Sequence, residues 1–345
     1  MCRPCSARFI VRRPCNNRGE RQLVSEISVL GAGAFGTALA ISLARSGRDV
    51  QLWARSEGAA SEMQKRRENM GRLPGKPFPE TLQITADLTQ ATKAEILLLA
   101  VPMQQLARFA EENKTLFLHK TLVACCKGVD LSSDRGPLEV LEDTLPGATV
   151  AILSGPSFAV DIADGLPTAL TLALRDNERV EDLQSHLSTD NIRLYSSIDP
   201  LGVEFGGALK NVIAIACGLA IGAGFGESAR AALMTRGFAE MQRLAFKLGA
   251  DPTTLSGLSG FGDLVLTCTS EKSRNYSHGL KLGQGAQIDP SVTVEGVATA
   301  KAVVHLSQTL GVDMPITSAI TQIINGTVSI SEAVEMLLSR PLKRE

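Results

Sequence analysis

The chain has 345 residues, of which 44% are hydrophobic and 21% charged, and its formal net charge is -1. This composition is typical of a globular protein, and the length is sufficient for two domains with separate cores. The near-neutral charge excludes a general nucleic-acid or membrane-surface binder.

The first 24 residues differ in composition from the rest of the chain. They contain six arginines and a single acidic residue, Glu20, and they show no periodic apolar pattern. No apolar segment of signal-peptide length is present, so we do not expect secretion. We expect residues 1–24 to form a basic, disordered tail or to reflect an early start codon, and the composition leaves an organelle transit peptide as an alternative.

Cysteine usage argues for a reducing compartment and against a metal site. The chain has seven cysteines, an odd number, and several lie in apolar surroundings, which fits reduced thiols in a cytoplasmic protein. Cys2 and Cys5 have zinc-like spacing, but no second pair completes a site. The four histidines show no paired or motif spacing.

From residue 26 the sequence alternates between short apolar runs and helical stretches. The predicted strands are "EISVL", "DVQLWAR", "AEILLLAV", "TLVACCK", "ATVAILSG", "TALTLAL" and "IRLYSS". β-rich runs that alternate with helices indicate a parallel sheet covered on both faces. The predicted fold is therefore α/β, beginning with a Rossmann-like, doubly wound parallel sheet over residues 25–198.

After about residue 199 the strand-like runs disappear. Predicted helices cover residues 203–222, 228–248, 277–283, 295–310, 315–325 and 330–339, with Gly and Pro between them. The apolar run over residues 212–225 is too short to span a bilayer and contains three glycines, so we expect a buried helix. Residues 199–345 are predicted to form an all-α, substrate-binding domain.

The segment "GAGAFG" at residues 31–36 matches the pattern G-x-G-x-x-G, with glycines at Gly31, Gly33 and Gly36. It follows a strand and opens a helix, which is the context that a dinucleotide-binding turn requires. The first glycine permits the tight turn, the second lets the backbone approach a pyrophosphate, and the third lets helix and strand pack closely. The helix N-terminus then offers free N–H groups to the phosphates.

The second strand indicates which dinucleotide is bound. Its end usually carries an acidic residue for the ribose 2′-hydroxyl, but this chain has Arg55 there. Arginine pairs with a 2′-phosphate, so NADP is the expected cofactor, with NAD as a second possibility. The alternative interpretation of Arg55 is a solvated surface charge.

Hydride transfer at a carbon that carries oxygen needs a proton donor or acceptor beside that oxygen. Lys210 stands in the apolar segment "GALKNVIAIACG", where burial would lower its pKa into a useful range. The alternative is a lysine with a buried stem and a solvated head group. Lys127 follows a strand, at the edge where open α/β sheets bind ligands.

Three further groups of residues are candidates for holding a substrate. Gly155 and Ser157 follow another strand, and Asp263 lies in a polar, glycine-bearing segment of the helical part. The donors suited to a phosphate are Ser273, Arg274 and Asn275.

Six blocks occur in a familiar order: "GAGAFGTALA", "CCKGVD", "SGPSFA", "GVEFGGALKNVIAIACG", "GFGDLVLTCTSEKSRN" and "VEGVATAK". Over roughly residues 26–335 the chain closely resembles the bacterial-type, NAD(P)-dependent sn-glycerol-3-phosphate dehydrogenases. The resemblance implies interconversion of dihydroxyacetone phosphate and glycerol 3-phosphate for phospholipid synthesis, in a site between two domains.

The resemblance also implies residue roles. The proton acceptor falls on Lys210. The implied substrate contacts are Lys127, Gly155, Ser157, Lys210, Asp263, Ser273, Arg274 and Asn275. The implied cofactor contacts, beside the three glycines, are Ala34, Phe35, Arg55, Lys127, Ala159, Arg274, Thr293 and Glu295. The family often has serine at position 34 and valine at position 293, so here a side-chain hydroxyl contact is missing at position 34 and a backbone role is implied at position 293.

Two other functions are compatible with parts of the pattern. A β-hydroxyacid dehydrogenase of the 6-phosphogluconate type shares the Rossmann domain, a helical partner and a catalytic lysine, but "GFGDLVLTCTS" and "SRN" argue against it. A nucleotide-sensing protein without turnover would have no need of both Lys127 and Lys210. We expect a cytoplasmic enzyme, a small-molecule substrate, and a homodimer as the commonest oligomeric state.

Overall fold

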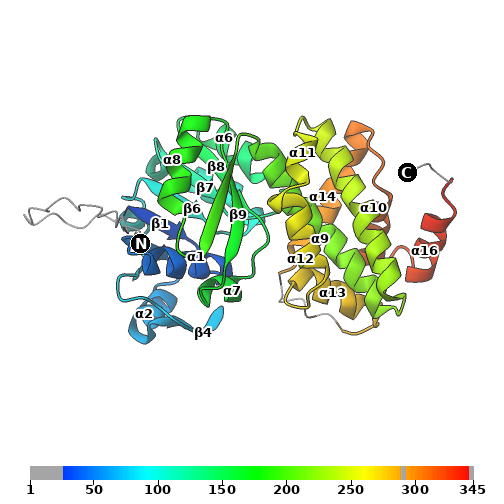
Figure 1. Cartoon of the computed structure of the whole chain (residues 1–345), viewed down its shortest axis with the longest axis horizontal. Helices are drawn as coiled ribbons and strands as arrows, with labels where there is room; N and C mark the ends of the chain where they lie inside the picture. Colours follow the sequence, from blue (N-terminus) through cyan, green and yellow to red (C-terminus); the bar gives the residue numbers. More distant parts are fainter. Residues whose placement is uncertain (1–25, 288, 290–292, 342–345) are drawn as a thin grey trace, which may run out of the picture.

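The structure is a computed structural model that describes residues 26–341 except 288 and 290–292. The expected basic tail at residues 1–24 lies outside the described residues. Two parts lie side by side in Figure 1: residues 26–198, here called the αβ region, and residues 199–341, here called the helical region.

An eight-stranded sheet forms the centre of the αβ region, with strand order β10-β9-β8-β7-β6-β1-β2-β5. Its strands are β1 (Ile27–Leu30), β2 (Val50–Trp53), β5 (Gln83–Thr85), β6 (Ile96–Leu99), β7 (Thr121–Ala124), β8 (Thr149–Ser154), β9 (Thr168–Ala173) and β10 (Ile192–Ser197). A separate antiparallel pair, which the sequence analysis did not predict, joins β3 (Glu68–Asn69) to β4 (Leu73–Pro77).

The predicted Rossmann-like sheet is confirmed, but one pairing is not parallel. β1, β2, β5, β6, β7 and β8 pair in parallel, whereas β9 pairs antiparallel with β8 and parallel with β10. The chain between β8 and β9 contains only the short helix α7 (Ala159–Ala163). Because α7 packs on α1 (Ala34–Arg45) instead of crossing the sheet, the chain re-enters the sheet from the end at which it left.

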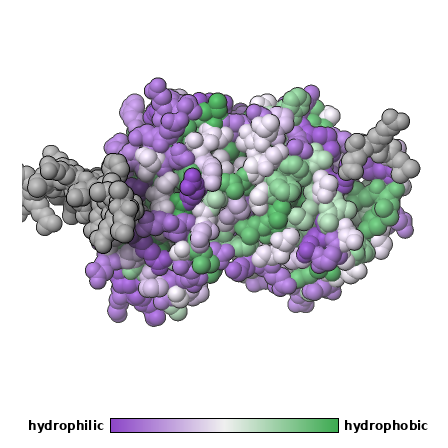
Figure 2. All heavy atoms as spheres, in the orientation of Figure 1, coloured by the Kyte–Doolittle hydropathy of each residue, from purple (hydrophilic) through white to green (hydrophobic). Residues whose placement is uncertain are grey.

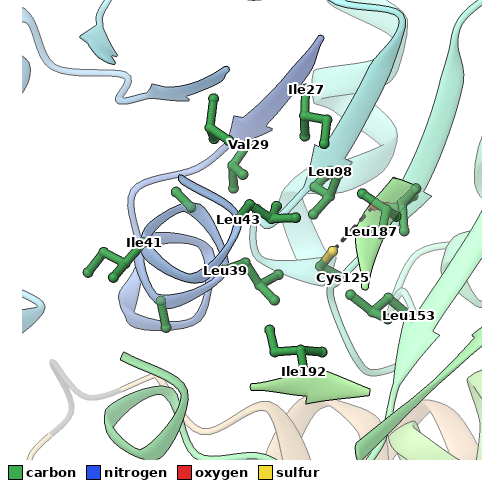
Figure 3. Close-up of a cluster of buried hydrophobic side chains, with 14 of the residues drawn as sticks. Ile27, Val29, Leu39, Ile41, Leu43, Leu98, Cys125, Leu153, Leu187 and Ile192 are labelled. Carbon is green, nitrogen blue, oxygen red and sulfur yellow. Dashed lines mark hydrogen bonds between the residues drawn. The ribbon is translucent and has the colours of Figure 1, made fainter. Parts of the chain in front are cut away.

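Helices cover both faces of the sheet because adjacent residues of each strand point to opposite faces. Val29 and Leu98 pack with α1, α7 and α8 (Asn177–Leu187), as Figure 3 shows for part of this cluster. Leu30 and Leu99 point the other way, into the cluster of the second face. The helices of that face are α4 (Met103–Glu112), α5 (Lys114–Phe117) and α6 (Pro137–Thr144), while α2 (Glu57–Arg66) and α3 (Leu88–Ala91) lie near β5.

The helical region has no strand among its described residues, as predicted. Its elements are α9 (Pro200–Gly222), α10 (Gly226–Lys247), α11 (Pro252–Leu255), the π-helix η1 (Leu258–Gly262), α12 (Asp263–Cys268), α13 (Arg274–Gly283), α14 (Glu295–Leu310), α15 (Pro315–Ile324) and α16 (Ile330–Leu338). The prediction for α14 matches at both ends. The elements α11, η1 and α12 were not predicted, because the glycines at positions 257, 260 and 262 are typical of a break between helices.

α9 is the central helix of the helical region. It is long and apolar enough to cross a membrane, but 89% of its apolar window is buried inside the fold. Together with its contacts to α10, α12, α13 and α14, this burial identifies α9 as a core helix. The predicted buried helix is therefore confirmed.

Glycines allow α9 and α13 to approach each other very closely. A Cβ on Gly279 would lie 2.0 Å from the carbonyl oxygen of Ile215, and one on Gly218 would lie 2.0 Å from the carbonyl oxygen of Tyr276. These contacts place Tyr276, in the first turn of α13, beside Gly218 in the second half of α9.

We expect Gly279→Ala to lower the free energy of unfolding by about 1–3 kcal/mol, measured by urea denaturation, because the new methyl group forces two backbones apart. This loss should appear although alanine is the better helix former. Gly71→Ala is the matched control, since a Cβ there meets nothing within 4 Å. Equal stabilities of the two variants would contradict the prediction.

Candidate functional site

The glycine turn lies between β1 and α1, at the carboxyl edge of the sheet. α1 begins after the N-cap Gly33 with no side-chain cap and no acidic residue in its first turn. A Cβ on Gly33 would meet nothing within 4 Å, so open space lies in front of this helix end. An uncapped, positive helix end beside open space fits the pyrophosphate of a dinucleotide.

Gly31 and Gly36, the other two glycines of the turn, are required by the backbone geometry. Gly31 adopts a φ of +121°, and a Cβ on Gly36 would lie 2.2 Å from the carbonyl oxygen of Gly31. Asn69, from the unpredicted β3–β4 pair, holds the turn by donating to the carbonyl oxygen of Ala32 at 3.0 Å. Nothing in the sequence around Asn69 indicated this role.

Two lysines and one carboxylate meet where the αβ region faces the helical region. Lys127, after β7, donates to Asp263 Oδ2 at 2.6 Å, and Lys210, on α9, donates to Asp263 Oδ1 at 2.7 Å. Asp263 is 1% exposed and Lys210 is 7% exposed. We call Lys127, Lys210 and Asp263 the lysine cluster.

Burial sets the protonation of the Lys210 amine. Desolvation lowers its pKa to about 8, the positive charge of Lys127 acts in the same direction, and Asp263 opposes both. The alternative of a solvated head group is wrong for Lys210, because its amine is buried and bonded to Asp263 and Thr267. A lysine with this pKa exchanges a proton near neutral pH.

Thr267 belongs to the site and was not predicted. Its hydroxyl accepts from Lys210 Nζ at 2.7 Å and donates to Asp263 Oδ1 at 3.3 Å. Asp263 and Thr267 are four residues apart and therefore lie on one face of α12. Recognising "GDLVLTC" as a helix would have revealed this relationship.

The predicted residues after β8 join the lysine cluster through one carbonyl group. The carbonyl oxygen of Gly155 accepts from Lys127 Nζ and from the Ser157 hydroxyl, both at 3.2 Å. Gly155 has a φ of +146°, a conformation that favours glycine. Lys127, Gly155, Ser157, Lys210 and Asp263 therefore form one connected group.

The predicted phosphate-binding residues gather at the N-terminus of α13. Ser273 caps the helix by accepting from the N–H of Tyr276, which leaves its own hydroxyl proton available to donate. Arg274 is exposed in the first turn, beside a hollow of about 140 Å³ that Lys272 and His278 also line. Asn275 accepts through Oδ1 from the N–H of Gly296 at 2.9 Å, which ties α13 to the start of α14.

Glu295 connects α14 with the cations of the site. Burial raises the pKa of its carboxyl, and the positive charges of Arg274, Lys127 and Lys210 oppose that rise. Within residues 26–341, apart from the four undescribed positions, no side-chain bond joins Arg55, Ala159 or Thr293 to the lysine cluster. Arg55 is exposed after β2, Ala159 begins α7, and Thr293 precedes α14.

Two further features of the described residues lie outside the lysine cluster. The described part of the chain holds no group of three or more His, Cys, Asp or Glu residues suited to a metal ion. A larger hollow of about 670 Å³ follows the outer strand β10, lined by Asn191 and Arg193 among others. None of the residues that line this hollow is a predicted site residue.

Comparisons with known proteins agree with this geometry. Residues 26–180 match the family model described as NAD-dependent glycerol-3-phosphate dehydrogenase N-terminus, and residues 199–335 match the model for the C-terminus of the same enzymes. A glycerol-3-phosphate dehydrogenase [NAD(P)+] from Ruegeria sp. is 58% identical over 92% of this chain and 99% of its own length. A protein of the same name from Paracoccus denitrificans is 53% identical over the same shares of the two chains.

A solved structure shows the same overall arrangement. The crystal structure of glycerol-3-phosphate dehydrogenase from Coxiella burnetii superposes with a TM-score of 0.86 and 38% sequence identity. The superposition covers 92% of this chain and 99% of that one. The likeness therefore includes both the αβ region and the helical region.

Proposed function

The chain belongs to the NAD-dependent glycerol-3-phosphate dehydrogenase family, and from this membership we propose that Lys210 donates and accepts the proton of its reaction. The chain is an NAD(P)-dependent oxidoreductase, and its substrates are glycerol 3-phosphate and dihydroxyacetone phosphate. One observation carries the proposal for Lys210: its amine is buried at the junction of the two regions and bonded to Asp263 and Thr267.

Proton transfer is the part of the reaction that this chain performs. The bound nicotinamide supplies or accepts the hydride. In reduction, the Lys210 ammonium donates a proton to the oxygen on C2 of the substrate; in oxidation, the neutral amine accepts it. Asp263 and Thr267 orient the amine, and the second cation, Lys127, stabilises negative charge on the same substrate.

Phosphate binding is assigned to the first turn of α13. Arg274 is exposed there, and Ser273 and Asn275 flank it at the helix N-terminus. A positive helix end beside a guanidinium group suits a phosphate dianion. Gly155 and Ser157 complete the substrate contacts on the side of the αβ region.

Cofactor binding is assigned to Gly31, Gly33, Ala34, Phe35 and Gly36 at the start of α1, with further contacts from Ala159, Arg274, Thr293 and Glu295. The uncapped helix end supports this assignment. Arg55 favours NADPH over NADH, because its exposed guanidinium group after β2 suits a 2′-phosphate.

We expect Arg55→Asp to raise the KM for NADPH by about 10- to 100-fold, because a charge-assisted contact to the 2′-phosphate is replaced by repulsion. The KM for NADH should change much less. Steady-state reduction of dihydroxyacetone phosphate with each cofactor measures both values. An equal effect on the two cofactors would show that Arg55 does not read the 2′-phosphate.

Membership of the glycerol-3-phosphate dehydrogenase family argues against both alternatives, a dehydrogenase of the 6-phosphogluconate type and a nucleotide-sensing protein. Assays of NADPH oxidation with dihydroxyacetone phosphate and of NADP⁺ reduction with 6-phosphogluconate test it directly, and a nucleotide sensor would turn over neither substrate. Turnover with 6-phosphogluconate alone would overturn the proposed function.

We place the boundary between a dinucleotide-binding and a substrate domain at residues 198–199, and we place the enzyme in the cytoplasm, where it supplies glycerol 3-phosphate to phospholipid synthesis. We also propose a homodimer. The exposed side chains of Phe246, Phe261 and Val265 support it, and Figure 2 shows apolar surface over the helical region. Light scattering that gives a mass of 36.6 kDa would show a monomer.

A further inference from the structure

A buried carboxyl group on α9, that of Glu204, has no part in the proton transfer. Glu204 is 4% exposed and stands six residues before Lys210. Its Oε2 accepts from the backbone N–H of Leu138, in the first turn of α6, at 2.6 Å. This bond joins the helical region to the αβ region.

The N-terminus of α6 is formed so that it receives a carboxylate from outside. Its N-cap is Gly136, which has no capping side chain, and Pro137 follows at the first helical position. Proline has no N–H, so Leu138 carries the first N–H group in need of a partner. A Cβ on Gly136 would lie 1.8 Å from Glu204 Oε1, so only glycine leaves room for the carboxylate.

A short loop with internal hydrogen bonds connects the N-terminus of α6 to Lys127 of the lysine cluster. Residues 127–136 connect Lys127 to α6. Within this loop Asp130 accepts from the N–H groups of Ser132 and Ser133, and its own N–H donates to the carbonyl oxygen of Arg135. The loop is thus stiffened between Lys127 and Glu204, while the helix α9 connects Glu204 to Lys210.

We propose that Glu204 is a positioning residue: by joining the N-terminus of α6 to α9, it sets the placement of Lys127 relative to Lys210 on the two sides of Asp263. This inference rests on the proposed role of Lys210. Glu204 touches neither lysine, so it acts only through the two rigid segments that meet at its carboxyl group.

The surroundings of the buried Glu204 side chain predict which substitution the protein tolerates at position 204. Burial raises the pKa of Glu204 to about 8, the Leu138 N–H and Arg175 oppose the rise, and the negative charges of Glu139 and Glu142 add to it. The rise in pKa favours the neutral carboxyl form of Glu204. Glutamine has the same shape, is neutral, and keeps an acceptor for the N–H of Leu138.

The test compares three variants in the reduction of dihydroxyacetone phosphate at pH 7. We expect Glu204→Gln to keep kcat within about threefold of the wild type, because an acceptor of the same reach remains. Glu204→Asp withdraws the carboxyl group by one methylene, and Glu204→Ala removes it. Both should lower kcat by about 10- to 100-fold, the scale of a 1 Å misplacement, with little change in the KM for NADPH.

Glu240→Ala is the matched control for lost stability. Glu240 is 1% exposed and accepts from the N–H groups of Ile316 and Thr317 at the start of α15, entirely within the helical region. Its removal should lower the melting temperature as Glu204→Ala does, and leave kcat within about twofold wherever the protein is folded. If Glu204→Ala does not fold, the comparison of Glu204→Asp with Glu204→Gln decides the question.

Two outcomes would overturn the inference: unchanged kcat in Glu204→Asp, or equal losses of kcat in the Glu204→Ala and Glu240→Ala variants. A failure of the proposed function has a different signature. In that case Lys210→Ala retains turnover in the same assay, whatever the Glu204 variants do.

Discussion

Lys210→Ala is expected to lower kcat for the reduction of dihydroxyacetone phosphate by about 10²–10⁴-fold, because the group that donates the proton is removed. The binding of NADPH, measured by fluorescence titration, should stay near that of the wild type, because the glycine turn at the start of α1 is untouched. Lys247→Ala, at an exposed position of α10, is the control for loss of a positive charge. Turnover within a few-fold of the wild type would remove Lys210 from the mechanism.

The pH dependence of the wild type provides an independent check on Lys210. Its pKa is lowered to about 8, so the ammonium form predominates below pH 8 and the neutral amine above it. Reduction needs the ammonium, so its kcat should be level below pH 8 and fall above it. Oxidation needs the amine and should show the reverse. The alanine variant should lose both limbs, because the residue that titrates is absent.

The local sequence pattern was sufficient to predict those parts of the site that are formed by residues close together in the sequence. The glycine turn is recognisable because a strand, three glycines and a helix follow one another within about 20 residues. Lys210 is recognisable because it stands in the apolar segment "GALKNVIAIACG", and only the structure decides between a buried and a solvated head group.

Contacts between distant segments could not be predicted in this way. The sequence separates Lys210 from Thr267 by 57 residues and Glu204 from Leu138 by 66, and only the fold brings each pair together. The antiparallel pairing of β9 has the same cause, because strand direction depends on whether the connection crosses the sheet. The short helix α12 was missed because tertiary packing on α9, rather than its own length, holds it in place.

Asp263→Asn is expected to have the second large effect, on stability as well as on catalysis. Asp263 is buried between two ammonium groups, with Lys127 at 2.6 Å and Lys210 at 2.7 Å. Replacing the carboxylate by a neutral amide leaves both cations without their partner. Removal of one member of a buried ion pair costs about 3–5 kcal/mol, and urea unfolding at pH 7 should show a loss of that size.

The same substitution should move the pH dependence in a defined direction. Asp263 is the main group that raises the pKa of Lys210 against burial and the charge of Lys127. Without it the pKa falls below about 8, so the decline of the reduction rate should begin at lower pH than in the wild type. Asp164→Asn, which breaks the pair between Lys76 and the exposed Asp164 side chain, far from the lysine cluster in the sequence, should cost less than about 1 kcal/mol and leave the profile unchanged.

A double variant tests whether the unpartnered lysine charges cause the effects of Asp263→Asn. Asp263→Asn combined with Lys127→Met removes one of the two unpartnered cations, so it should recover part of the lost stability and part of the shift in the pH profile. If the single variant is as stable as Asp164→Asn and its profile is unmoved, Asp263 does not control the lysine pair. The proposed proton transfer depends on a Lys210 amine whose charge is balanced by the Asp263 carboxylate. That result would therefore count against the mechanism as well.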